Sequence, residues 1–169
     1  MKDQQKIDMI TEENESIGSV TRAEVRKHNL LHRAVLLCVF NSEGNMYIRK
    51  RSLGKDVYPD LYGVSCEGMV FEGETFEDAA ERKLKEELGI TAPFLFVRSF
   101  RYKDEKLNYL GHIYAIQYEG KVTLNSEGAH GSFVSIDNVQ ELVAEKKFMP
   151  DVKQILTTYI KEIKDRALK

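Results

Sequence analysis

The spacing of hydrophobic and polar residues along the chain predicts a mixture of short strands and helices. Stretches rich in β-branched and aromatic residues are typical of strands, and apolar residues three or four positions apart are typical of helices. Strands are expected at residues 7–10, 16–20, 32–40, 45–49 and 62–66, in two segments of 94–118, and near Val122 and 133–136. Helices are expected after Thr21, over 75–88, and over 137–146 and 151–168. Neither a repeat nor an interdomain linker divides these elements, so one domain is expected.

Specific residues mark several turns and helix ends. The segment 41–44 (Asn-Ser-Glu-Gly) separates two strand-like stretches and predicts a hairpin between them. Thr21 followed by Glu24 has the spacing of a capping box, in which each side chain binds the other residue's backbone amide. Thr75 is a suitable N-cap for the helix that follows it, and Gly89 can adopt the left-handed conformation that ends it.

Composition limits the classes of partner. A chain of 169 residues can bury an apolar core without disulfides. Its 25 basic and 27 acidic residues leave a net charge of -2, which does not favour a nucleic acid polymer or an anionic membrane as partner. No apolar run approaches the ~20 residues that a membrane-spanning helix needs. The two cysteines, Cys38 and Cys66, lack metal-ligand spacing, so a cytoplasmic protein with reduced thiols is expected.

The predicted helix 75–88 combines apolar and charged residues on one face. With about 100° per residue, its apolar side chains gather in one arc: Phe76, Ala79, Ala80, Leu84 and Leu88. Lys83 and Glu87 fall in the same arc, and Glu86 lies at its edge. Charges directed toward a core are costly unless they are paired or bind an ion. Two interpretations stay open: a local Lys–Glu pair on a partly solvated helix, or charges that converge on an ion or phosphate.

The residues around this helix resemble the Nudix box of diphosphate hydrolases. The positions that match its spacing are Gly68, Glu74, Arg82, Leu84, Glu86, Glu87, Gly89 and Ile90. The resemblance implies a Nudix fold of the α/β or α+β class, with a mixed β-sheet sandwiched between helices. It also implies an enzyme that cleaves a diphosphate linkage in a small nucleoside- or alkyl-diphosphate with Mg²⁺ or Mn²⁺.

The same resemblance implies roles for individual residues. Glu86 and Glu87 would bind the metal ion together with a backbone carbonyl near Gly68. Arg82 would orient the catalytic carboxylates and, with Glu74, brace the loop against the helix. Structural roles in the box would fall to Gly73, Glu74 and Gly89.

Lys83 departs from the box, because the family has a glutamate at this position. An ammonium in place of a carboxylate weakens a site for several metal ions and adds a contact for phosphate. Over residues 7–138 the chain also resembles the Nudix branch that contains isopentenyl diphosphate isomerase and its hydrolase-like relatives. That resemblance implies that Lys83, Arg51 and Lys55 bind the diphosphate of the substrate.

The isomerase reaction itself matches the sequence poorly. The position of the isomerase cysteine holds Glu67, and Cys66, one residue away on a strand, faces the opposite side. Met69 replaces a histidine ligand, and only His32 and Glu87 remain of the isomerase metal set. Hydrolysis is therefore the preferred interpretation, because binding alone cannot replace a missing acid–base group.

Two further carboxylates are candidates for assisting the attacking water. Glu127 is either the base or a third metal ligand, or it is a solvent-facing residue of a turn. Glu67 is a candidate for restoring part of the carboxylate charge that Lys83 removes. His112, in an apolar strand, is interpreted as a packing residue rather than a ligand.

The expected protein is a single Nudix domain over residues 1–169. N-terminal strands and a short helix occupy 1–30, the box occupies 68–90, and C-terminal helices occupy 137–169. Its expected partner is a small-molecule diphosphate, and a homodimer is left open. Two rivals to hydrolysis remain: an isoprenoid diphosphate isomerase with a rearranged acid–base pair, and a non-catalytic module that binds a diphosphate or nucleotide.

Overall fold

A computed structural model describes residues 1–126, 128–145 and 147–169, without the side chains of residues 128 and 129. Within these residues the strands of one mixed sheet are β1 (Lys6–Ile10), β2 (Ser16–Thr21), β3 (His32–Phe40), β4 (Met46–Arg51), β5 (Tyr62–Gly63), β6 (Cys66–Met69), β7 (Leu95–Lys103), β8 (Asn108–Gln117) and β9 (Gly128–Val134). The helices are η1 (Lys2–Gln4), α1 (Arg22–His28), α2 (Phe76–Lys83), the π-helical turn η2 (Leu84–Leu88), α3 (Ile136–Ala144) and α4 (Pro150–Ala167).

Strand β3 is the centre of the sheet. It runs parallel to β8 along its whole length, from His32 opposite Tyr109 to Phe40 opposite Gln117. On its other side it pairs with the short antiparallel strand β6. Because β3 is flanked by strands and covered on both faces, nearly all of its side chains are buried, which explains its continuous apolar run.

The hairpin expected around residues 41–44 forms only at its turn. Backbone bonds close the turn, but β3 and β4 pair at a single position, Phe40 opposite Met46. Beyond it, the hydroxyl of Ser65 accepts a hydrogen bond from the Val39 amide and donates one to the Tyr47 carbonyl. This buried serine bridges the two strands where they separate, and β4 pairs with β5 and β9 instead. The strand expected at 62–66 is correspondingly split into β5 and β6.

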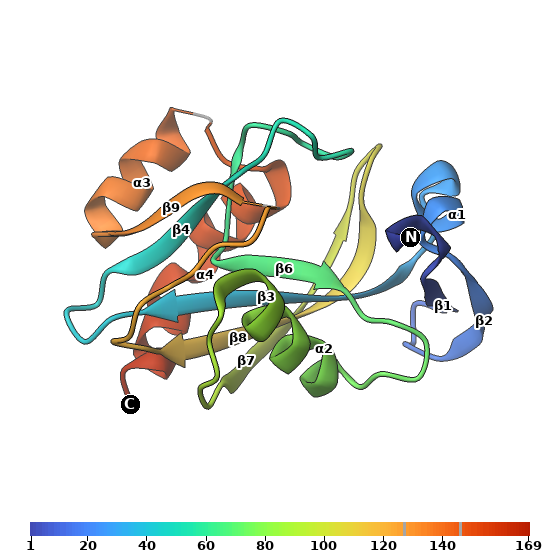
Figure 1. Cartoon of the computed structure of the whole chain (residues 1–169), viewed down its shortest axis with the longest axis horizontal. Coiled ribbons are helices and arrows are strands. Elements are labelled where there is room, and N and C mark those ends of the chain that lie inside the picture. The colour runs from blue at the N-terminus through green and yellow to red at the C-terminus, as the bar shows by residue number, and fades with distance from the viewer. Residues whose placement is uncertain (127, 146) are drawn as a thin grey trace.

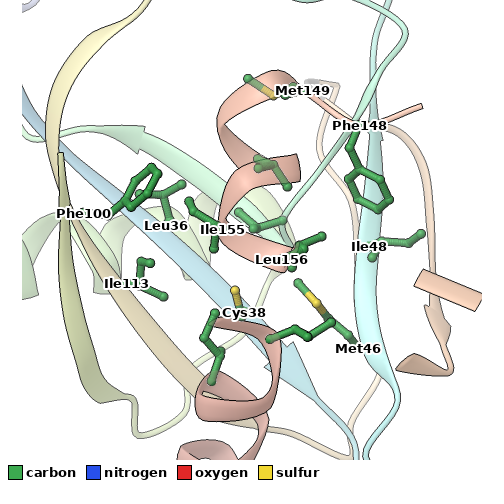
Figure 2. Packing of buried hydrophobic residues seen from close by; sticks show 14 of the residues in the cluster. Leu36, Cys38, Met46, Ile48, Phe100, Ile113, Phe148, Met149, Ile155 and Leu156 are labelled. Atoms are coloured by element: carbon green, nitrogen blue, oxygen red, sulfur yellow. The ribbon is translucent and has the colours of Figure 1, made fainter. Parts of the chain in front are cut away.

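Alternate residues of β3 face two different cores. The residues on one face pack against α4, as Figure 2 shows for Leu36, Cys38, Ile155 and Leu156. The residues on the other face, among them Val35 and Leu37, pack against Leu84, Leu88 and the rest of the segment α2–η2. Helices α2 and α4 therefore cover opposite faces of the sheet (Figure 1), and the expected mixed sheet between helices is confirmed.

Two smaller expectations have different outcomes. The strand expected near Val122 is wrong: residues 121–125 form no strand, although the Thr123 amide donates to the Leu88 carbonyl. Cys38 and Cys66 are buried free thiols, and burial raises the pKa of each to about 12.

Among the helices in the described ranges, none combines the length and apolarity needed to cross a membrane.

Candidate functional site

The loop before α2 is tied to that helix by one arginine. The guanidinium of Arg82 donates to both carboxylate oxygens of Glu74, over 2.6 and 2.9 Å, and to the Met69 carbonyl over 3.0 Å. The same guanidinium lies 3.6 Å from the centre of the Phe71 ring. Glu74 in turn accepts from the Phe71 amide at 2.8 Å. These contacts hold the loop between β6 and α2 in one conformation.

Both ends of the helical segment follow from the sequence. Thr75 forms a capping box with Asp78, and Gly73, just before it, has a φ of +81° that favours glycine. Gly89, with a φ of +65°, ends the segment in the left-handed conformation. The last turn is π-helical rather than α-helical, a detail that the 3.6-residue period does not predict.

A group of buried charges lies between this helical segment and the sheet. Each oxygen of the Glu87 carboxylate is bound by a different cation, one by Lys83 and the other by Arg49. Arg51 binds Glu67 and also donates to the Val57 carbonyl at 2.9 Å. Arg49 lies 3.6 Å from Glu67 and so links the two pairs. The pairing of Lys83 with Glu87 matches the simpler interpretation of the helix, but the pair is buried instead of partly solvated.

Gly68 makes room for Lys83. A Cβ atom at residue 68 would lie 2.6 Å from Cε of Lys83 and 3.1 Å from its Nζ. The lysine chain therefore passes directly over the backbone of β6. Burial lowers the pKa of Lys83 to about 7 even though Cys66 and Glu67 act in the opposite direction.

A cavity of about 100 Å³ next to this group is rich in positive charge. We call it the cationic pocket; among the residues described, its basic side chains are Lys2, Arg22, Arg26, Arg51, Lys55, Arg82 and Lys83. Two carboxylates, Glu67 and Glu86, also line it. Burial, together with the nearby Arg51, lowers the pKa of Lys55 to about 7. An excess of cations in a partly enclosed site suits an anion with several charges.

The N-terminal contributors to this pocket carry no motif. Arg22 and Arg26, four residues apart on α1, both ion-pair with Asp56, and Arg22 also binds Asp3 at 2.8 Å. Sequence analysis missed them, together with Lys2, because only the fold brings α1 next to the box. Their spacing on one helix face was the available signal.

Comparison with known proteins places this geometry in a family. The model of the NUDIX domain matches residues 30–159, well over half of the chain. The chain belongs to the Nudix family. The match includes the box residues and the whole of the central sheet from β3 to β9.

Individual Nudix proteins agree with this assignment. The "Uncharacterized Nudix hydrolase PA4841" of Pseudomonas aeruginosa is 31% identical over 94% of this chain and 95% of its own length. The isopentenyl-diphosphate Delta-isomerase of Serratia proteamaculans is 31% identical over 85% of this chain and 82% of its own. Hydrolases of the Nudix family act on diphosphate bonds, and the expectation of a Nudix hydrolase is confirmed.

Solved Nudix structures share the fold. The crystal structure of DR0079 from Deinococcus radiodurans has a TM-score of 0.80 at 23% identity, and the alignment covers 90% of this chain and 98% of that one. The Nudix domain of Shewanella oneidensis NrtR, solved with ADP ribose, has a TM-score of 0.65 at 16% identity and covers 87% and 99%. The fold of the box and its sheet is thus that of the Nudix family.

The box carboxylates fit a resident divalent cation poorly in this chain, although Nudix hydrolases generally use such ions. Both oxygens of Glu87 already bind cations, and Glu86 is half exposed, 3.6 Å from Arg82. Within the described ranges, no three His, Cys, Asp or Glu side chains form a group that could hold a metal. Glu86 and Gly68 do line the cationic pocket. One carboxylate suits a magnesium ion that arrives already bound to phosphate oxygens.

Of the other candidate residues, one carboxylate lies at the cationic pocket and two histidines serve other roles. Glu127 lies outside the described residues. His32 is buried and its Nδ1 donates to the Leu30 carbonyl at 2.9 Å, since a carbonyl can only accept. His112 stacks on Phe76 with 3.5 Å between ring centres, which is the contact of a packing residue. Glu67 lines the cationic pocket beside Gly68, and one of its carboxylate oxygens lacks a hydrogen-bond partner among the described residues.

Proposed function

We propose that the protein hydrolyses the diphosphate linkage of a small nucleoside- or alkyl-diphosphate bound in the cationic pocket. The observation that carries the proposal is the concentration of basic side chains against the Nudix box, with Lys83 among them. A diphosphate carries several negative charges, and the basic side chains of this pocket can compensate them. A neutral substrate would not need so many cations.

In this proposal Arg51, Lys55 and Lys83 bind the phosphate oxygens and stabilise the charge that develops on them. Glu86, which lines the cationic pocket 3.6 Å from Arg82, would bind the Mg²⁺ or Mn²⁺ ion that accompanies the diphosphate as part of the substrate. Glu87 accepts a hydrogen bond from the Lys83 ammonium and so fixes the position of the lysine.

Glu67 is the described candidate for assisting the attacking water, and Glu127 is the other. Burial alone would raise the pKa of Glu67, but Arg51 and Arg49 outweigh burial and hold the pKa below 4.5. Glu67 is therefore ionised at neutral pH and able to accept a proton from water that attacks phosphorus as the phosphoanhydride bond breaks.

The proposal is tested by phosphate release from a panel of diphosphates, with Mg²⁺, with Mn²⁺ and with a chelator. Lys83→Met, which nearly keeps the length of the side chain but removes its charge, should reduce kcat/KM by about 10- to 100-fold. The reason is that a charged hydrogen bond contributes about 1.5–3 kcal/mol. The exposed Lys85, two residues away in η2, is the matched control, and Lys85→Met should change nothing. A wild-type protein that releases phosphate from no member of the panel contradicts the proposal.

Two alternatives are separated by their own measurements. The isomerase of Serratia proteamaculans and the hydrolase of Pseudomonas aeruginosa are equally identical to this chain, so isomerisation is the first alternative. It would appear as deuterium exchange into isopentenyl diphosphate without phosphate release. The second alternative is a non-catalytic binding module, and the observation behind it is the lysine at a glutamate position of the box. It would bind diphosphate without turnover, and Lys83→Glu would then create activity.

The proposal treats residues 1–169 as one domain, because Lys2, Arg22 and Arg26 from the N-terminal elements line the same pocket as the box. A cytoplasmic location and a homodimer stay predictions. Sedimentation at micromolar concentration measures the second.

A further inference from the structure

A second cavity, of about 60 Å³, adjoins the cationic pocket and has a different character. We call it the apolar cavity; its hydrophobic lining is Ala34, Val35, Leu36, Val57, Met69, Leu107 and Met149. Arg26, Arg51, Glu67, Gly68 and Met69 line both cavities, so the two adjoin at the start of the Nudix box. A diphosphate held by the cations would have its organic group next to the apolar cavity.

Asp151, the second residue of α4, also lines the apolar cavity. The residue is 3% exposed, and its Oδ2 accepts a hydrogen bond from the Tyr109 hydroxyl at 2.7 Å. Over the described part of the chain, its Oδ1 makes no hydrogen bond of ordinary geometry, although the backbone amides of Asp151 and Val152 lie close enough to act on the carboxyl group. A buried acceptor without a donor costs about 1–3 kcal/mol, and packing gives no reason for a carboxylate here.

Another polar side chain that lines the cavity is also an acceptor. His32 uses its Nδ1 hydrogen on the Leu30 carbonyl, which leaves Nε2 as an acceptor. Burial lowers the pKa of His32 to about 4, so the ring is neutral. The arginine donors of the lining, Arg26 and Arg51, are shared with the cationic pocket, whereas His32 and Asp151 line the apolar cavity alone. These two acceptors, away from the cationic pocket, favour a ligand that ends in a hydrogen-bond donor.

Size and charge narrow the ligand further. A cavity of about 60 Å³ is smaller than the ~150 Å³ that accommodates benzene, so it takes a short chain and not a nucleobase. Arg26 and Arg51 line the same cavity and offset the charges of the carboxylates Glu67 and Asp151, so the lining offers no net negative charge for an ammonium group. A hydroxyl donates a hydrogen bond without the cost of burying a charge.

We propose that the apolar cavity is the subsite for the organic half of the diphosphate substrate, and that Asp151 selects a short alkyl group ending in a hydroxyl. This inference rests on the proposed function and names the substrate class of the same site. Asp151 acts on substrate choice through its free Oδ1, which accepts the hydrogen bond of the hydroxyl.

The test uses n-alkyl diphosphates with about three to five carbons and their ω-hydroxy counterparts. The measured quantity is the ratio of kcat/KM for the hydroxylated compound to kcat/KM for its alkyl partner. A wild-type ratio of about 10 to 100 is expected, because one hydrogen bond to a carboxylate is gained. Asp151→Leu should bring the ratio to about one or below, and the shape-preserving Asp151→Asn should lower it several-fold.

Asp137 provides the matched control. It is the second residue of α3, as Asp151 is of α4, but it is exposed, so Asp137→Asn should leave the ratio unchanged. Circular dichroism establishes which variants are folded, and Asp151→Asn decides the question if Asp151→Leu does not fold. A wild-type ratio near one, a ratio unaffected in a folded Asp151 variant, or a preference for ω-amino compounds would each overturn the proposal.

Calorimetry separates this inference from the proposed function. Dissociation constants for the same pairs, measured with a chelator present, give the hydroxyl preference without turnover. If the wild type releases no phosphate but still binds the hydroxylated member at least tenfold more tightly, hydrolysis fails and the subsite stands. If phosphate is released without any hydroxyl preference, hydrolysis stands and the subsite fails.

Discussion

Lys83 determines the character of the box at the level of a single residue. Its ammonium lies on Glu87, and the same lysine lines the cationic pocket. In a typical Nudix box the glutamates would share a metal ion with the substrate. Here the ammonium group of Lys83 takes the place of that cation. The sequence shows the substitution at once, whereas the arginine on the other oxygen of Glu87 comes from β4, 38 residues earlier, and has no signal in the box.

Asp151 gives the clearest dependence of stability on pH. Burial raises its pKa from an ordinary 3.8 to about 6, although the Tyr109 hydroxyl and backbone amides at the start of α4 act in the opposite direction. The folded state thus binds the proton more tightly than the unfolded state. The contribution of this group to stability is complete below pH 3.8 and is lost as the pH rises through about 6.

We therefore expect the free energy of unfolding of the wild type, relative to Asp151→Asn, to fall by roughly 3 kcal/mol between pH 3.5 and pH 7. Urea unfolding across this range measures the difference. The difference is used because His32 acts oppositely: its pKa, lowered from 6.5 to about 4, makes its contribution grow as the pH rises through this window. Parallel curves for the two proteins would contradict the assignment.

At the scale of elements, local sequence signals predicted the ends of helices better than the pairing of strands. The capping box at Thr21, the N-cap at Thr75 and the left-handed Gly89 are all as expected, because each depends on neighbouring residues alone. The hairpin at 41–44 was predicted with the wrong pairing, since Ser65, 26 residues from Val39 and 18 from Tyr47, bridges the separating strands. Pairing depends on distant residues that no local pattern contains.

The contact between β6 and α2 yields a prediction of its own. Gly68→Ala would place a methyl group 2.6 Å from Cε of Lys83, whose ammonium is fixed on Glu87. We expect a loss of about 1–3 kcal/mol in urea unfolding and weaker binding of diphosphate, because the lysine chain must shift. Gly54→Ala is the control, because no atom lies within 4 Å of its new Cβ.

A double-mutant cycle identifies the cause of that loss. In a Lys83→Ala background the clash is absent, so Gly68→Ala should cost about 1 kcal/mol less than in the wild type. Equal costs in both backgrounds would mean that the glycine is needed for the backbone of β6 and not for the lysine.

At the scale of the whole molecule, the cationic pocket joins parts that lie far apart in the chain. Its basic residues come from η1, α1, β4, the loop after β4, and α2. Sequence analysis identified the part supplied by the box and by β4, because the resemblance covers it. The contribution of the first 30 residues depends on how β1 and β2 extend the sheet beside β3, which is a property of the folded chain (Figure 1).

This arrangement separates the effects of metal and diphosphate on thermal stability. The described carboxylates form no metal cage, so a chelator should leave the Tm of the ligand-free protein unchanged. Inorganic diphosphate at about 100 times its Kd should stabilise the fold by about 2.7 kcal/mol, or roughly 5–10 °C in Tm, because it binds elements that unfold together. Lys83→Met should show a smaller shift at the same concentration. A chelator that lowers Tm by several degrees would instead demonstrate a resident ion, and Glu87 would then have to exchange its bond to Lys83 for one to the metal.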